Sequence, residues 1–376
     1  YPHYMKRIYL DYNATTPIDP DIAEALKNLD FPLNPSSVHF YGKKSKGYYL
    51  DAVDSIAKVL RVKPTELFFT SSATEALNWI FYSFSQKFPQ SHVITSNVEH
   101  VAIDAPLKHL EKEGRLSVSY LPVGLKGSLD VEQIAAAITE KTKMVVLMSV
   151  NNETGVKTDI ASIAQLTQQK GIFLVVDAVA HFGKDPFTLF PGISAAIFSG
   201  HKIHAPLGSG LLFSSSSSFP LTPLFLGGGQ ERGLRSGTEN VPAIVGLSMA
   251  FKKVEAQIDQ IAAHMQKLKN QLIKGLQQLV PHAFIHGQAP WVSNTFSMAF
   301  PGYAGEDLWM HLDLAGVCTS LGSACSSGTL APSRVLLQMD IDPLLVRSSL
   351  RFSLGRITTE QEIADCLERC RTIFCS

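Results

Sequence analysis

Apolar and polar positions follow two different periods between about residue 50 and residue 215. Short apolar runs of strand length alternate there with longer segments in which apolar residues recur at helical spacing. The runs predict strands at Glu66–Thr70, His92–Thr95, Met144–Met148, Phe173–Asp177, Ala195–Ser199 and Gly210–Phe213. The helical spacing predicts helices at Tyr48–Leu60, Asp130–Thr139 and Ile160–Gln169. Strands that alternate with helices favour an α/β fold with a mostly parallel central sheet covered by helices.

The C-terminal part of the chain has a different pattern. Helical periodicity continues from Pro242 to about Val280, a length that suits a connector between two domains. Beyond it the pattern is α+β, with elements predicted at Asn294–Ala299, Glu306–Leu314, Pro332–Gln338, Ser348–Ser353 and from Thr359 onward. We therefore predict a large α/β domain over residues 15–258 and a small α+β domain formed by residues 5–14 and 259–376.

The composition narrows the class of protein. The 33 basic and 33 acidic residues cancel, and no basic block occurs, so the electrostatic pattern of a nucleic-acid-binding protein is missing. No apolar stretch approaches the roughly 20 residues that cross a bilayer, so we expect no membrane partner. Five cysteines in 376 residues are too few for a disulfide scaffold, which predicts reduced thiols and a cytoplasmic location.

A lysine and an acid follow two neighbouring apolar runs. Asp177 ends the run Phe173–Asp177, and Lys202 comes directly after the next one, in Ser199–Lys202. A lysine amine can form a Schiff base with the aldehyde of pyridoxal phosphate, and a carboxylate beside the ring nitrogen keeps that nitrogen protonated. Alone, the pair would be better explained by a strand-end acid and a surface lysine.

Other polar residues also come where predicted strands end. Ala73 and Thr74 lie at a strand-to-helix turn that could bind a phosphate through backbone N–H groups, or could be an ordinary N-cap. His100 follows the next strand and could lie over a pyridine ring, or be a structural histidine. Asn152, in a turn after a further strand, could donate to cofactor and substrate. Arg351 lies on a predicted strand, where its planar fork suits a substrate carboxylate or an ordinary ion pair.

Two loops carry flexible small residues beside reactive groups. Gly227–Thr238 is dense in glycine and holds two arginines, so it could reach an anion across an interface. Leu321–Gly328 places Cys325 among glycine and serine residues. A cysteine on such a polar loop is better placed to react than a cysteine in an apolar run.

Together, and in this order, these segments resemble the class V aminotransferase family of fold-type I pyridoxal phosphate enzymes. They are most similar to its NifS/IscS-like cysteine desulfurases. The resemblance covers nearly the whole chain, from Tyr9–Pro17 to Arg351–Arg356. Its most specific motifs are Ser199–Lys202, Gly229–Thr238 and Gly322–Cys325. It implies pyridoxal 5'-phosphate as cofactor and no metal.

The resemblance also implies a role for each matching residue. The implied cofactor-binding residues are Ala73, Thr74, His100, Asn152, Asp177, Ser199, His201, Lys202 and Thr238. Of these, Lys202 would carry the cofactor, and Thr238 would reach the phosphate of a neighbouring subunit, which implies a homodimer with shared sites. Asn152 and Arg351 would hold the carboxylate of L-cysteine. Cys325 would be the nucleophile, with Lys202 and His100 as the other catalytic residues.

The chain departs from the family pattern at several positions. Ala180 stands where the family usually has a glutamine that donates to the phenolic oxygen of the cofactor. Ser72 replaces a usual glycine in the phosphate turn, and Ala331 replaces a usual glutamate after the cysteine loop. Longer members carry a C-terminal extension that helps to dock the cluster scaffold, whereas this chain stops at Ser376. We expect Ala180 to alter the pKa of the internal aldimine, a change that could slow the chemistry.

The predicted function is conversion of L-cysteine to L-alanine, with a persulfide formed on Cys325. The persulfide sulfur would pass to an acceptor protein, an iron–sulfur scaffold or a SufE-like carrier, for iron–sulfur cluster assembly or thio-cofactor synthesis. Three alternatives stay open at this point: a selenocysteine lyase, a small-amino-acid aminotransferase, and a weakly active cofactor-binding scaffold for sulfur delivery.

Overall fold

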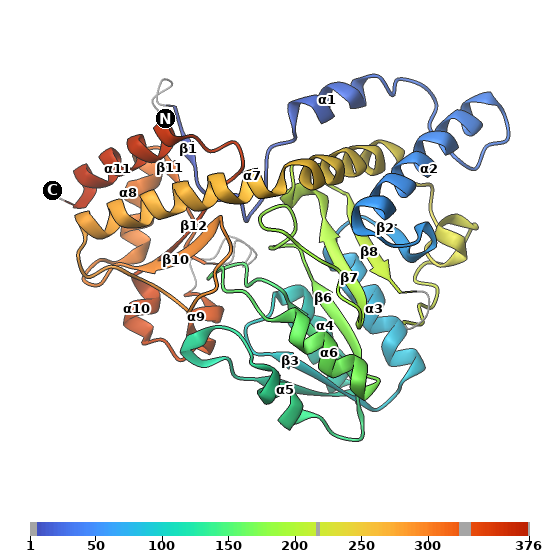
Figure 1. Ribbon diagram of the computed structural model, residues 1–376, viewed down its shortest axis with the longest axis horizontal. Coiled ribbons are helices and arrows are strands. Elements are labelled where there is room, and N and C mark those ends of the chain that lie inside the picture. The colour runs from blue at the N-terminus through green and yellow to red at the C-terminus, as the bar shows by residue number, and fades with distance from the viewer. Residues whose placement is uncertain (1–5, 216–218, 323–331, 375–376) are drawn as a thin grey trace.

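A seven-stranded sheet forms the centre of the larger part of the molecule, in the order β2-β8-β7-β6-β5-β3-β4 (Figure 1). The computed structural model describes residues 6–215, 219–322 and 332–374. The strands are β2 (Leu67–Thr70), β3 (Ser91–Ser96), β4 (Leu116–Leu121), β5 (Thr142–Met148), β6 (Phe173–Asp177), β7 (Ile193–Ser199) and β8 (Gly210–Ser214). All neighbours pair in parallel except β8, which runs antiparallel to β2 and β7. The mostly parallel α/β sheet that the sequence predicted is therefore confirmed.

Helices bury both faces of this sheet. They are α2 (Phe40–Leu60), α3 (Ala73–Lys87), α4 (Val101–Lys112), α5 (Val131–Ala137), α6 (Ile160–Lys170) and the first half of α7 (Val241–Leu279). Side chains of α3 and α4 share one apolar core with Val175 of β6. Its neighbours Leu174 and Val176 join the core of α2, α5, α6 and α7 on the opposite face. Because both faces are buried, the strands read as continuous apolar runs rather than as alternating ones.

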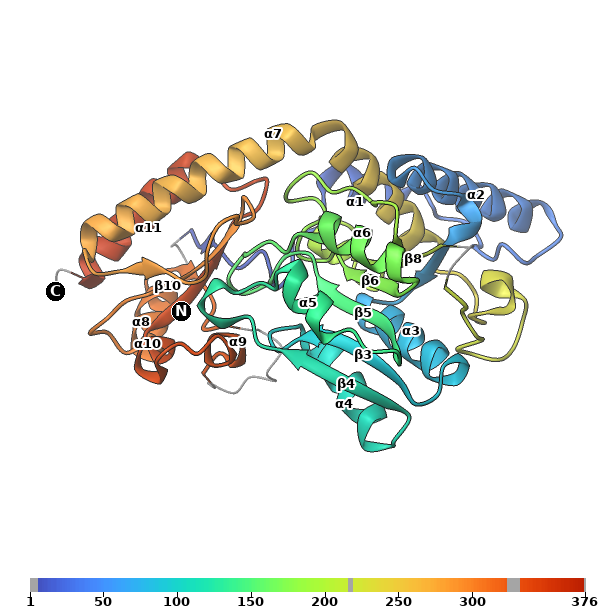
Figure 2. The same cartoon turned by 60° about the horizontal axis from the view of Figure 1, so that its bottom comes forward.

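A smaller group of elements has its own core (Figure 2). Its strands are β1 (Ile8–Tyr9), β9 (Phe284–Ile285), β10 (Thr295–Ala299), β11 (Val317–Cys318) and β12 (Ser349–Ser353). Its helices are α8 (Gly305–Leu314) and α11 (Glu360–Phe374). The buried residues of α9 (Arg334–Gln338) and α10 (Pro343–Arg347), such as Leu336 and Val346, instead join a core of the large sheet. The order β12-β10-β9 is antiparallel, and β1 pairs with β11. The N-terminal strand thus lies beside elements of the C-terminal third, although the domain boundary at residues 258 and 259 stays a prediction.

The helix α7 joins the two cores (Figure 1). Its early residues Ile244, Leu247 and Phe251 pack in a core of the large sheet, and its late residues Leu268 and Leu272 pack in the core of the small part. One continuous helix therefore fixes the spacing of the two sheets. Within the part of the chain that the structure describes, no helix is long and apolar enough to span a membrane.

Several elements were not predicted, among them α1 (Pro20–Lys27) and α4, and two of the differences have identifiable reasons. The strand β4 lies at the edge of the sheet, and most of its residues are only half-buried. Serines such as Ser117 and Ser119 therefore alternate with apolar residues, and the sequence shows no continuous apolar run that would predict a strand. The helix α2 begins at Phe40 instead of Tyr48. Its first turns are mostly exposed and carry no apolar stripe, while His39 caps them by accepting from the backbone N–H of Gly42. A helical turn that is exposed to solvent on all sides produces no apolar periodicity in the sequence.

Candidate active site

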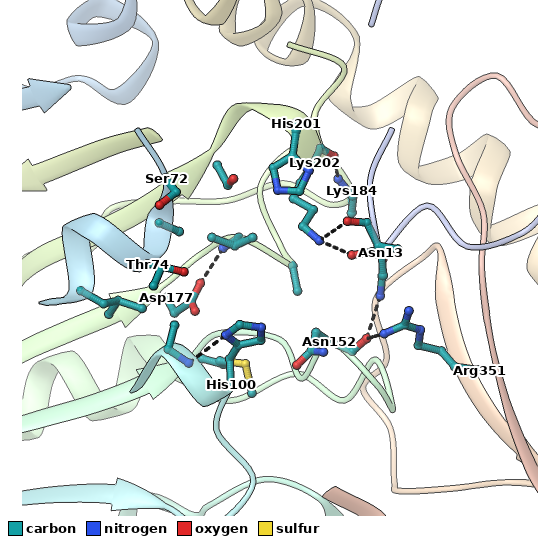
Figure 3. Close-up of a pocket in the computed structure, with 18 residues that line it drawn as sticks. Asn13, Ser72, Thr74, His100, Asn152, Asp177, Lys184, His201, Lys202 and Arg351 are labelled. Carbon is teal, nitrogen blue, oxygen red and sulfur yellow. Dashed lines mark hydrogen bonds between the residues drawn. The ribbon is translucent and has the colours of Figure 1, made fainter. Parts of the chain in front are cut away.

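The carboxyl ends of β2, β3, β5, β6 and β7 meet at one edge of the large sheet, where a cavity opens toward the small sheet (Figure 3). Because these strands run in the same direction, the loops that follow them converge there. All but two of the predicted site residues line this cavity: Ala73, Thr74, His100, Asn152, Asp177, Ser199, His201, Lys202 and Arg351. The exceptions are Thr238 and Cys325. The structure thus assembles one site from residues that are far apart in the sequence.

Lys202 projects into the cavity from the short turn that follows β7. Its Nζ donates to the main-chain oxygens of Asn13 and Ala14, the latter at 2.7 Å. A second lysine, Lys184, also lines the cavity and donates to the main-chain oxygen of Lys202. Burial, with the charges of Lys202 and Arg356, lowers the pKa of Lys184 to about 7. Lys184 was not predicted, because nothing in its local sequence marks a lysine that folds inward.

Asp177 ends β6 and is buried at the floor of the cavity. One of its oxygens accepts from the backbone N–H of Val179 at 2.9 Å. Burial raises the pKa of Asp177 to about 6, although that hydrogen bond and the charge of Lys202 act in the opposite direction. A buried carboxylate of this kind is stabilised by a cationic N–H beside it. Asp177 and Lys202 line the same cavity. The Asp177 carboxylate therefore fits the pyridinium nitrogen of pyridoxal phosphate, and the Lys202 amine fits its aldehyde.

The start of α3 provides an anion-binding corner of the same cavity. Ser72 caps the helix by accepting from the backbone N–H of Glu75 at 3.2 Å, and Ala73 and Thr74 form the first turn. The helix dipole and free N–H groups favour a phosphate at such a position. Across the corner, burial and the charges of Lys202 and Lys184 lower the pKa of His201 to about 4, so its ring is neutral at pH 7 and can donate one hydrogen bond.

His100 closes another side of the cavity, where it is the N-cap of α4. Its Nδ1 accepts from the backbone N–H of Ala102 at 3.1 Å, so the neutral ring carries its proton on Nε2. Burial, with the charges of Lys202 and Arg334, lowers the pKa of His100 to about 4. His100 is consequently a weak base, suited to covering a ring and to donating from Nε2. Lys202 is the better candidate for taking a proton from the substrate.

Arg351 reaches the cavity from β12 of the small sheet (Figure 3). Its Nη2 donates to Oδ1 of Asp11 at 2.6 Å, and its Nη1 to the main-chain oxygen of Asn152 at 3.4 Å. Its Nε is buried and has no hydrogen-bond partner among the described residues. A buried donor without a partner costs free energy, so the protein alone does not fully satisfy the Arg351 guanidinium. Asp11 was not singled out in advance, although it stands in the N-terminal motif Tyr9–Pro17.

Thr238, Cys325 and Ala180 each differ from the residues above. Thr238 lines a separate hollow with Glu231 and Arg235. Cys325 lies outside the described residues, so its place relative to the cavity stays a prediction. Ala180 lines the cavity, and its neighbour His181 instead packs edge to face on Phe187, with ring centroids 5.3 Å apart. His181 thus does not take the place of the glutamine that Ala180 replaces.

Comparisons with known proteins agree with this geometry. The family described as Aminotransferase class-V matches residues 8–365. A cysteine desulfurase of Nostoc sp. is 38% identical over 97% of this chain and 92% of its own length. The cysteine desulfurase IscS of Rickettsia africae is 36% identical over 95% of this chain and 88% of its own length.

Solved structures give the same result. One described as a NifS-like protein aligns with a TM-score of 0.91 and 34% identity, over 98% of this chain and 99% of its own. A structure described as SspA in complex with cysteine aligns with a TM-score of 0.78 and 28% identity, over 93% and 99% of the two chains. The fold, the cavity and these matches together place the chain in the class V aminotransferase family, among its NifS/IscS-like cysteine desulfurases.

Proposed function

We propose that this chain uses pyridoxal 5'-phosphate to convert L-cysteine to L-alanine, leaving the sulfur as a persulfide on Cys325. The observation that carries the proposal is the single cavity in which Lys202, Asp177 and Arg351 meet. A cysteine-bound structure among the relatives supports L-cysteine as substrate. When bound, the cofactor supplies an electron sink for the negative charge that develops on the substrate.

Binding and orientation of cofactor and substrate fall to residues that line the cavity. The first turn of α3, with Ser199 and His201, would hold the phosphate. Asp177 would pair with the ring nitrogen, since burial has already made its isolated negative charge unfavourable. Arg351, which lines the cavity, would take the substrate carboxylate. A carboxylate held by a fixed guanidinium orients Cα toward Lys202.

The proton and the sulfur would then move in separate steps. Lys202 would take the Cα proton, since the lone pair on Nδ1 of His100 is already engaged. The Cys325 thiolate would attack the substrate sulfur and form a new S–S bond. The electron pair of the broken Cβ–S bond would stay on carbon, which is protonated to give alanine. The persulfide sulfur would pass to an acceptor protein such as an iron–sulfur scaffold or a SufE-like carrier.

A homodimer is part of the proposal, because Thr238 does not line the cavity of its own chain. Hybrid dimers test this point: subunits carrying Thr238→Ala would be mixed with subunits carrying Lys202→Ala. If Thr238 acts in the partner's site, each hybrid contains one intact site and regains about half of the activity of two wild-type sites. Activity no greater than the sum of the separate variants would contradict the shared site.

The central experiment measures products and colour together. The purified protein should be yellow, and L-cysteine should yield equal amounts of alanine and sulfide in the presence of a reducing thiol. Cys325→Ala should keep the colour and lose sulfide release, whereas Lys202→Ala should lose the Schiff base that borohydride reduces. A keto acid product, or full alanine production by the Cys325 variant, would refute the proposed mechanism.

A further inference from the structure

The segment that carries Cys325 is attached at its first end to the strand that carries Arg351. Ser320 and Arg351 exchange both backbone hydrogen bonds, at 2.7 and 3.2 Å. The Ser320 hydroxyl then donates to the main-chain oxygen of Gly322 at 2.7 Å, which fixes the last described residue before the segment. Gly322 is therefore held beside the strand that carries Arg351.

The second end is attached to the loops that carry His100 and Asn152. Ser333 donates from its hydroxyl to Oε2 of Glu153 at 2.5 Å, and Glu153 directly follows Asn152. Arg334 donates from Nη1 to the main-chain oxygen of Asn97 at 3.0 Å, and from Nη2 to that of Glu99. The residue after Glu99 is His100. The first turn of α9 thus contacts two loops of the cavity.

Both ends meet at Glu153. A methyl group placed on Gly322 would lie 3.2 Å from Cβ of Ser333 and 3.3 Å from Oε2 of Glu153. The Glu153 side chain is buried, and its backbone N–H is itself held by Oδ1 of Asn151 at 2.9 Å. Burial raises the pKa of this carboxyl, while Ser333, Arg351 and Arg334 oppose that effect.

Local helix capping does not require this arrangement. The hydroxyl of Ser333 already caps α9 by accepting from the backbone N–H of Leu336 at 3.1 Å. Its donation to Glu153 is an additional link between segments that are far apart in the sequence. Placing a carboxylate in the interior costs free energy that a neutral residue would not cost. A position that bears this cost without a capping need is a candidate for a functional role.

We propose that Glu153 and Arg334 are positioning residues of the sulfur-transfer step, which hold the two ends of the Cys325 segment on the loops of Asn152 and His100. They thereby set where Cys325 meets the sulfur of L-cysteine held by Arg351. The inference rests on the proposed function, because it needs Cys325 as the sulfur acceptor. It assigns neither residue a contact with substrate or cofactor.

The test separates substrate capture from sulfur transfer in the holoenzyme. Glu153→Ala and Arg334→Ala remove the two links, and Glu153→Gln keeps an oxygen that can accept from Ser333. Exposed residues of neighbouring helices provide matched controls, Glu306→Ala on α8 and Arg347→Ala on α10. The absorbance change on adding L-cysteine measures substrate capture. Single-turnover formation of persulfide and alanine measures sulfur transfer.

We expect the Ala variants to keep the absorbance change and a KM within about three-fold of wild type. We expect their single-turnover persulfide formation to slow about 10- to 100-fold, since small misplacements of reacting groups cost rates of this order. Glu153→Gln should retain most of the rate, and both controls should behave as wild type. A role in folding alone would instead reduce cofactor content and capture together with transfer.

The inference is wrong if wild type forms persulfide and both Ala variants form it equally fast. It is also wrong if capture and transfer decline in parallel in both. If Glu153→Ala does not fold, Arg334→Ala and Arg334→Lys make the same comparison, with Lys expected to restore part of the rate. If wild type itself releases no alanine from L-cysteine, the proposed function is wrong, and the inference that depends on it is wrong as well.

Discussion

The pair formed by Asp11 and Arg351 lies between the two sheets and offers a sharp test of how the substrate binds. Asp11 holds Nη2 of Arg351 at 2.6 Å, and the Arg351 side chain is only 2% exposed. The substitution Asp11→Asn removes one negative charge and leaves the shape of the side chain nearly unchanged. It should therefore change both the stability of the protein and its affinity for L-cysteine.

The expected loss of stability follows from the burial of Arg351. Removing one partner of a buried ion pair costs about 3–5 kcal/mol, because the other charge stays in the interior. The Asp11 side chain is 17% exposed, and water near it relieves part of this cost. We therefore expect the free energy of unfolding to fall by about 3 kcal/mol, at the lower end of that range.

The expected change in binding has the opposite sign. In the absence of Asp11, the guanidinium is no longer shared, and a substrate carboxylate gains a hydrogen bond to a charged donor. Such a bond contributes at least about 1.5 kcal/mol, so the dissociation constant of L-cysteine should fall about ten-fold. Urea unfolding measures the first effect, and an absorbance titration of the holoenzyme with L-cysteine measures the second.

A matched control is available in the exposed pair of Arg7 and Asp313, whose nitrogen and oxygen are 3.0 Å apart. Both side chains are well solvated, so Asp313→Asn should change neither stability nor L-cysteine binding measurably. Weaker L-cysteine binding by Asp11→Asn would refute the view that Asp11 competes with the substrate. Unchanged stability would refute the view that the pair is buried.

Three further predictions concern other parts of the molecule. Because the pKa of Lys184 is lowered in the folded protein, the unfolded chain binds more protons between pH 7 and 10, and the free energy of unfolding rises with pH in that range. In cofactor-free protein, urea unfolding should show that Lys184→Met abolishes about 2 kcal/mol of this rise between pH 7 and 9. Gly155 has φ +75° and a Cβ there would lie 2.6 Å from the main-chain oxygen of Thr295, so Gly155→Ala should cost at least about 2 kcal/mol by the same assay. Leu272→Ala, in the core of the small part, should cost about 2–5 kcal/mol, whereas Gln271→Ala on the exposed side of α7 should cost less than about 0.5 kcal/mol; equal effects would contradict the assigned core.

Much of the large sheet could be predicted because its signal is local. The run Leu174–Val176 is apolar on both faces, and Val175 indeed faces a different core from its two neighbours. The placement of Asp177 and Lys202 at consecutive strand ends then implied one shared edge, since parallel strands end on the same side. β4 was missed because an edge strand with one exposed and one half-buried serine carries little of that apolar signal.

The chemistry of the site could be assigned only in part from residue types and motifs. These indicated Lys202, Asp177 and Arg351. They did not indicate that Asp11 forms an ion pair with Arg351 or that Lys184 lines the cavity. Neither fact follows from periodicity, because each depends on a contact between segments far apart in the chain. Ala180 was visible in the sequence, whereas the orientation of His181 away from the cavity was settled by the packing of its ring on Phe187.

The sequence by itself thus determined most strands of the large sheet, their parallel arrangement and the family of the chain, because apolar periodicity and short motifs are properties of neighbouring residues. The tertiary structure alone decided that Arg351 of the small sheet faces the large-sheet cavity and that Glu153 meets both Gly322 and Ser333. Such contacts arise from the packing of the whole chain around α7. No local pattern of residues encodes the distance between two sheets.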